Sequence, residues 1–252
     1  MDIKAFISRV LISSLVLFSG AISGATLVDA EIGVGAWFYD SLGNINHQGT
    51  TADVDTELKL DDDAGSVSYI ILEHSLPNIP NIRLKQMGLT SSGGGTVSGA
   101  GFTFGGTSYV AGDAITTELV LDHTDVSLYY RIFDTVVDLD LGVTIMMLEG
   151  RAEVTRAGVI NRKLIDIVVP MAHYKLGLEL PYPGFRFQFD GSHMDMSDGY
   201  FCSLDSKIIY SPDTFYGVEV GYRDEKFKFD GKEGLYSDID YEGPFVNLFV
   251  HF

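Results

Sequence analysis

The sequence has a single cysteine, few basic residues and no long hydrophobic run in its main part. Cys202 has no second cysteine to pair with, which excludes an internal disulfide framework. Beyond residue 25 no apolar segment is long enough for a transmembrane helix. Basic side chains number 17 against 35 acidic ones, giving a formal charge of −18. Because such a charge repels nucleic acid, we expect no nucleic-acid partner.

The amino-terminal segment has the pattern of an export signal. A basic stretch precedes the apolar run Val10–Phe18, and small residues follow as far as Ala25. The run is too short for a spanning helix. We therefore expect residues 1–25 to be a cleaved signal peptide and residues 26–252 to be a single domain.

Short segments that alternate apolar with polar or small side chains recur along the rest of the chain, and this period of two predicts strands. In the clearest one, Asp138, Asp140, Gly142 and Thr144 lie between the apolar residues Val137, Leu139, Leu141, Val143 and Ile145. An apolar face on nearly every strand favours a membrane barrel, with lipid outside and a filled lumen inside, over a soluble β-sandwich.

Short turns alternate with longer connections, as in outer-membrane barrels. We expect turns near 76–80, 133–135, 181–184 and 211–214, loops near 41–64, 91–113, 149–160 and 228–242, and a shorter connection near 191–199. The fold expected is all-β, an antiparallel transmembrane β-barrel of about ten strands, or about eight if region 185–210 pairs differently. Pro170 lies inside one predicted strand and should leave a bulge or an unpaired position there.

The last segment, Phe245–Phe252, alternates as well and ends on an aromatic residue. Its apolar face consists of Val246, Leu248, Val250 and Phe252. This ending resembles the carboxy-terminal signal of bacterial outer-membrane barrels, although Asn247 stands where that signal often has glycine. The resemblance implies that the barrel-assembly machinery recognises these four residues.

Together with the export signal, the segments Leu128–Asp134 and Val137–Gly142 resemble a group of uncharacterised small outer-membrane barrel proteins of Gram-negative bacteria. The resemblance covers essentially the whole exported chain. It implies the outer membrane as the location, with lipid and lipopolysaccharide as surroundings. The group brings no established activity, and the sequence sets no oligomeric state.

Charged residues on the predicted lumen faces form the largest candidate site. They are Glu31, Glu73, Arg83, Lys85, Asp125, Arg131, Asp138, Asp140, Lys175, Glu179, Arg186, Asp190, Asp205, Lys207, Glu219 and Arg223. Buried charges must be paired or hydrated. Ion pairs would fill a narrow lumen and give a structural or surface protein, whereas a hydrated path would give a narrow channel for small solutes.

An enzyme is the alternative, and the residues that suggest it lie in 190–198. His193 and Asp195 would share a strand face near the outer rim, as an acid–base pair requires. Since no second catalytic cluster lies opposite them, we expect a non-enzymatic protein without a cofactor or a defined metal site. Acidic segments 53–57 and 61–63 lack the glycine and glutamate of an EF-hand, which leaves weak divalent-cation binding as their only metal chemistry.

Overall fold

The computed structural model describes residues 28–61, 63–76, 78–212, 215–231 and 234–252, and the regular structure within them is β-strand. In that part of the chain, no helix is long and apolar enough to cross a membrane. The predicted signal peptide lies outside the described residues. The strands are β1 (Val28–His47), β2 (Ala52–Asp53), β3 (Asp63–His74), β4 (Asn81–Gly88), β5 (Thr90–Thr96), β6 (Phe102–Phe104), β7 (Thr107–Tyr109), β8 (Ala114–Asp134), β9 (Val137–Arg156), β10 (Val159–Glu179), β11 (Phe185–Met196), β12 (Gly199–Tyr210), β13 (Tyr216–Asp230) and β14 (Leu235–His251).

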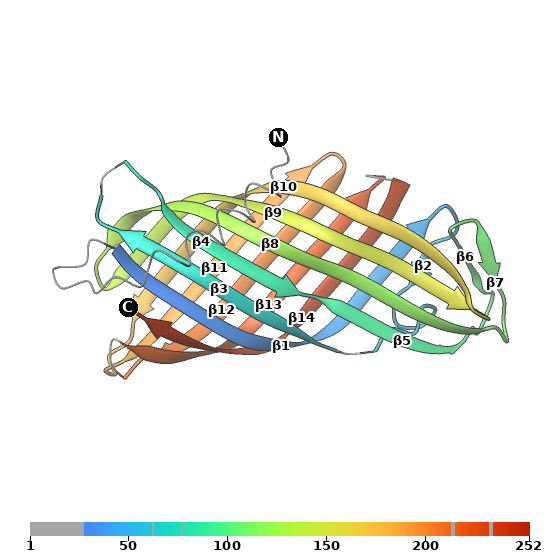
Figure 1. The fold of residues 1–252 in the computed structure, drawn as a ribbon, viewed down its shortest axis with the longest axis horizontal. Coiled ribbons are helices and arrows are strands. Elements are labelled where there is room, and N and C mark those ends of the chain that lie inside the picture. The colour runs from blue at the N-terminus through green and yellow to red at the C-terminus, as the bar shows by residue number, and fades with distance from the viewer. Residues whose placement is uncertain (1–27, 62, 77, 213–214, 232–233) are drawn as a thin grey trace.

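The wall is an antiparallel barrel in which β4 and β5 together serve as one strand beside β8 (Figure 1). It has the ten strands expected, and pairing of β1 with β14 closes it. The stagger of the sheet can be measured by moving from each residue to the residue paired with it on the next strand. Starting at Gly35 of β1, this path runs through β3, β4, β8 and β9 and ends at Ile167 of β10. The opposite path, through β14, β13, β12 and β11, leads to Glu179. The sheet therefore closes with a shear of 12 residues, which tilts the strands by about 40°.

Strand β9 changes the polarity of both its faces at one level. On β9, the outward residues are apolar from Val137 to Met147 and polar from Glu149 onward. The inward residues do the reverse, being polar or glycine up to Thr144 and mostly apolar from Met146 onward. The outward apolar stretch rises by roughly 25 Å along the tilted strand, which matches the apolar band of a membrane barrel.

The rest of the wall projects beyond this belt, on the side away from the chain's carboxy terminus (Figure 1). Residues 148–156 of β9 extend past the belt by roughly 20 Å. Short connections join the strands at the opposite end, where Glu31 pairs with His251. At the projecting end, the connections between β1 and β3 and between β5 and β8 span 15 and 17 residues, whereas those at the opposite end have at most six. Because the long connections of such barrels face outward, the projecting part faces the cell exterior.

The predicted loops at 149–160, 191–199 and 228–242 are wrong, because strands occupy most of each range. Only Ala157 and Gly158 join β9 to β10, both with positive φ (50° and 81°), as a two-residue hairpin turn requires. Likewise, β1 runs to His47 inside the loop predicted at 41–64, and 91–113 contains most of β5 and the β6–β7 hairpin. In the part of the wall that projects beyond the belt, the outward-facing residues are polar and therefore resemble loop sequence. The inward-facing residues that alternate with them form a core.

Pro170 behaves as expected at one edge of β10. It stays in register with Ile145 of β9. On the other edge, the ladder with β11 begins only at Ala172, opposite His193. Since proline has no N–H to donate, it marks the point where β10 and β11 separate.

Candidate functional site

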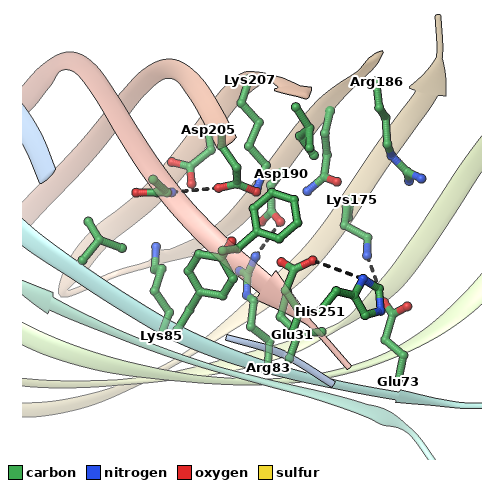
Figure 2. Close-up of a pocket in the computed structure, with 18 of the residues that line it drawn as sticks. Glu31, Glu73, Arg83, Lys85, Lys175, Arg186, Asp190, Asp205, Lys207 and His251 are labelled. Atoms are coloured by element: carbon green, nitrogen blue, oxygen red, sulfur yellow. Dashed lines mark hydrogen bonds and ion pairs between the residues drawn. The ribbon is translucent and has the colours of Figure 1, made fainter. Parts of the chain in front are cut away.

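A cavity of about 290 Å³ occupies the periplasmic half of the lumen (Figure 2). Asp29, Ser211 and His251 line it, so it reaches the end of the barrel where β1 starts and β14 ends. Its charged lining residues are Asp29, Glu31, Glu73, Arg83, Lys85, Arg131, Lys175, Arg186, Asp190, Asp205, Lys207, Glu219 and Arg223. Most of the charged residues predicted for the lumen therefore lie in one layer.

Two cations share two carboxylates on the β3–β8–β9–β10 side of this layer. Lys175 Nζ lies 2.6 Å from Asp140 and 3.3 Å from Glu73. Arg131 lies 2.5 Å from Glu73 and 3.4 Å from Asp140. The Tyr129 hydroxyl donates a further hydrogen bond to Glu73, at 2.8 Å. Each carboxylate thus has two cationic partners, which offsets the loss of hydration.

Further ion pairs involve residues that line the cavity. Arg186 contacts Asp138 and lies 3.1 Å from Glu179, while Lys207 lies 2.5 Å from Glu219. Glu31 differs from the other predicted lumen acids. Among the described residues its only ion-pair neighbour is His251, at 4.0 Å.

Two further arginines line the cavity, the partly buried Arg83 and the buried Arg223. Arg83 contacts Asp190 at 2.5 Å. Arg223 binds Asp205 with two hydrogen bonds of 2.6 and 2.8 Å, and its guanidinium lies over the ring of Phe245, 4.6 Å from the centroid. Such two-pronged pairs fix geometry strongly, so Arg223 forms a rigid inner boundary to the cavity.

Two residues that the sequence analysis did not single out, His123 and Glu225, lie on the side of the charged layer that faces the projecting part of the wall. Lys85 lies 3.5 Å from Asp125 and 3.6 Å from Glu225, and His123 Nε2 lies 3.5 Å from the other oxygen of Glu225. All four residues are buried. Glu225 alternates with Arg223, and His123 with Asp125, so strand parity could have placed both inside.

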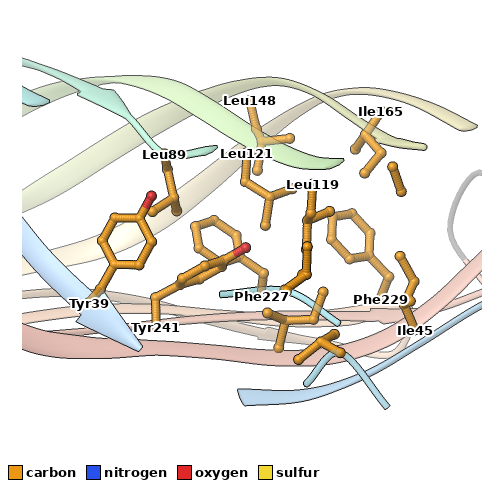
Figure 3. Close-up of a cluster of buried hydrophobic side chains, with 14 of the residues drawn as sticks. Tyr39, Ile45, Leu89, Leu119, Leu121, Leu148, Ile165, Phe227, Phe229 and Tyr241 are labelled. Atoms are coloured by element: carbon orange, nitrogen blue, oxygen red, sulfur yellow. The ribbon is translucent and has the colours of Figure 1, made fainter. Parts of the chain in front are cut away.

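Above this layer the lumen is filled with apolar side chains rather than with the ion pairs that the sequence predicts for a narrow lumen. Figure 3 shows Leu121, Leu148 and Ile165 facing Phe227 and Tyr241. None of these five is more than 2% exposed. Closely packed apolar side chains are an unfavourable environment for ions. We call this apolar cluster the plug.

Two connections complete the plug. Strand β3 begins only opposite Tyr39 of β1, and the segment after β1 takes its place beyond that point, with β2 beside Ile45 and a bridge from Leu60 to Gly93 of β5. The β6–β7 hairpin covers the outer end, where Phe104 packs edge-on against His47. The Gly-rich region therefore caps the barrel.

The residues of the enzyme alternative lie outside the lumen. His193 and Asp195 are both exposed on the outer face of β11, and the ring of His193 packs against Tyr174. Neither lines the cavity, whereas Asp190 of the same strand does. Among the described residues, no hydrogen bond or ion pair joins His193 to Asp195.

The acidic connection after β1 is used in local turns. Asp53 accepts hydrogen bonds from the N–H and hydroxyl of Thr56, and Glu57 accepts one from the N–H of Asp53. Across the described ranges, no group of three or more His, Cys, Asp or Glu side chains is arranged to hold a metal ion.

The carboxy-terminal strand closes the barrel. Val246, Leu248 and Val250 point outward from β14, and Phe252 exchanges two backbone hydrogen bonds with Ala30. The ring of Phe252 lies 6.0 Å from that of Phe215. These contacts place the four residues of the predicted assembly signal on the outer surface of the seam.

No family model matches the chain, and no curated protein matches it. Several solved structures are similar over almost the whole chain, at low identity. They include the attachment invasion locus protein Ail of Yersinia pestis (10% identity, 90% of this chain and 100% of Ail, TM-score 0.41), the outer membrane protease OmpT of Escherichia coli (11%, 93% and 99%, 0.48) and the transport unit of the autotransporter AIDA-I of Escherichia coli (9%, 98% and 96%, 0.39).

The fold follows from the barrel itself. A closed antiparallel barrel with an apolar belt satisfies every condition for crossing a bilayer with strands. The protein is a membrane-spanning antiparallel β-barrel, as the sequence predicts.

Proposed function

We propose that the protein is a closed, non-conducting and non-enzymatic barrel with a structural or recognition role at the cell surface. The plug carries this proposal. An ion leaving the charged cavity would have to cross a layer of buried leucine, isoleucine and aromatic side chains. Moving a charge into such surroundings costs far more than thermal energy.

The two faces of the wall support the same role. The belt would contact lipid and lipopolysaccharide, and the last strand would be recognised by the assembly machinery. Above the belt, the barrel extends as a rigid body with a charged wall and a hairpin cap. A rigid projecting structure is well suited to binding other molecules at the surface.

Planar-bilayer recording of the purified barrel tests this proposal. We expect no steady conductance from the wild type. Arg223→Ala should weaken the barrel without opening it, because the plug lies beyond that residue. The paired change Leu121→Asp with Leu148→Asp should hydrate the plug and introduce leak. Large ohmic steps from the wild type would instead make the protein a porin.

A control addresses the enzyme alternative. Peptide or lipid hydrolysis by the wild type that is lost in His193→Ala would overturn the non-enzymatic role. Equal turnover by both proteins would point to a contaminant. We expect no turnover by either.

A further inference from the structure

The cluster between the charged layer and the plug contains a histidine whose contacts show where its protons lie. His123 Nδ1 lies 3.0 Å from the carbonyl oxygen of Leu121. A carbonyl oxygen can only accept, so Nδ1 carries a proton. His123 Nε2 faces Oε2 of Glu225 at 3.5 Å, and among the described residues neither atom has another partner for a hydrogen bond. Two lone pairs would therefore face each other if His123 were neutral and Glu225 ionised.

The charges around this contact do not balance without a further proton. Lys85 Nζ lies 3.5 Å from Asp125 and 3.6 Å from Glu225. The Ser203 hydroxyl donates a hydrogen bond of 3.0 Å to the same oxygen of Glu225 that Lys85 approaches. None of the four ionisable residues is more than 5% exposed. One cation thus faces two carboxylates, and a buried surplus charge is costly unless it is compensated.

The nearest other cation is already bound. Arg223 lies on the same strand as Glu225, but it binds Asp205 of β12 with two hydrogen bonds, so these two charges cancel each other. The residues paired with His123 on β4 and β9 are uncharged. A proton held between Nε2 of His123 and Oε2 of Glu225 removes both the surplus charge and the contact between lone pairs.

We propose that His123 and Glu225 share one proton, and that this protonated pair, which we call the latch, fastens the base of the plug. On one side, Nδ1 binds the backbone of Leu121. On the other, the ring of Phe227 packs edge-on against the imidazole, with the centroids 5.7 Å apart. Leu121 and Phe227 both belong to the plug (Figure 3). The inference rests on the plug, which also carries the closed barrel proposed above.

Loss of the shared proton loosens the latch. When alkaline solution removes it, the cluster changes from neutral to one net negative charge, and Nε2 changes from a donor to an acceptor beside a carboxylate. Water must then satisfy Oε2 of Glu225, so the base of the plug becomes hydrated. The N–H of Leu121, which donates to the carbonyl of Leu89 at 2.8 Å, reports this change through hydrogen exchange.

Nitrogen-15 NMR of the barrel in nanodiscs, with labelled histidine, counts the protons on His123, and His123→Gln assigns its signals. Both ring nitrogens should carry a proton at about pH 7, and only Nδ1 should carry one at about pH 9.5. Over the same range, exchange of the Leu121 amide should become about tenfold faster or more, after correction for the intrinsic effect of pH.

Glu225→Gln separates the latch from general effects of pH, because it makes the cluster neutral without a proton on Nε2. The amide N–H of the new side chain donates to Nε2, so His123 should carry a single ring proton already at about pH 7. Exchange of the Leu121 amide should then change by less than about threefold up to about pH 9.5. Glu219→Gln is the matched control. Glu219 is also buried, but it pairs with Lys207, so this change should leave His123 doubly protonated at about pH 7.

Three results would overturn the inference. The first is a singly protonated His123 in the wild type at about pH 7, a measurement that needs no variant to fold. The second is a doubly protonated His123 in Glu225→Gln. The third is a wild type whose Leu121 exchange stays constant up to about pH 9.5. Steady conductance with a doubly protonated His123 would refute the closed barrel alone, whereas a silent membrane with a singly protonated His123 would refute the latch alone.

Discussion

The membrane half and the projecting half of this barrel are built from the same strands with opposite polarity. In the membrane half, Leu141 faces outward and Asp140 inward. Further along β9, Glu149 faces outward and Leu148 inward. The outer face follows its solvent, which is lipid in one half and water in the other. The interior is polar where it surrounds the cavity and apolar where it is closed.

The comparison shows that the two halves are stabilised in different ways. Hydrophobic burial supports the projecting half, as in a soluble β-protein. The interior of the membrane half depends on ion pairs, whose net contribution is small unless one partner is lost. Substitutions at equivalent inward positions should therefore differ in cost between the halves. The chain's one tryptophan, Trp37, is buried and provides a folding signal.

The largest effect is expected from a charge in the plug. Leu148→Asp places an unpaired carboxylate among apolar side chains and should lower the free energy of unfolding by more than about 4 kcal/mol. Urea unfolding followed by Trp37 fluorescence measures the change. Thr155→Asp, on the outer face of the projecting half, is the control and should stay within about 0.5 kcal/mol. Equal costs at both positions would argue against an apolar plug.

A charge on the lipid-facing side of the belt should lower the free energy of unfolding by somewhat less than a charge in the plug. Leu141→Arg exposes a guanidinium to lipid near the middle of the belt and should cost about 2–4 kcal/mol. The same unfolding assay in lipid vesicles gives the value, with Leu141→Ile as a control for packing. Labelling of a cysteine at position 141 by a water-soluble probe alone would show that the faces are reversed.

Removing a carboxylate from the lumen should lower the free energy of unfolding by less than either of these changes. Asp140→Asn leaves Lys175 and Arg131 with Glu73 as a shared partner, so we expect a loss of about 1–3 kcal/mol. Double-mutant cycles with Lys175→Met would isolate the pair. A coupling energy near zero would mean that water, rather than Lys175, compensates Asp140.

The smallest effect concerns acid sensitivity at the outer end. The N–H of Val110 and the Arg156 guanidinium hold the pKa of the Asp113 carboxyl below its ordinary value. A lowered pKa in the folded state adds stability above the unfolded pKa of about 3.9, and the gain is lost as pH falls through the folded pKa. Pepsin cleavage within 98–113 should therefore increase between pH 4 and pH 2, and less so in Asp113→Asn. An identical pH profile in both proteins would contradict this.

Strand parity predicted the interior charges well where a strand had been recognised. Arg83, Asp138 and Glu219 all face the lumen as the alternation indicates. The same alternation places His123 and Glu225 inside the barrel, where both are buried. The sequence could not show which charges meet, since Arg83 and Asp190 are 107 residues apart and come together only through the shear of the barrel.

By itself, the sequence determined the membrane barrel and the facing of its belt residues, because a period of two against lipid leaves a local pattern. Closure of the outer half was decided by the tertiary structure. Leu121, Ile165 and Phe227 lie in strands far apart in the chain, and each one alone looks like an ordinary alternating residue. Only the closed, tilted sheet brings them to the same level, where they fill the lumen and exclude water.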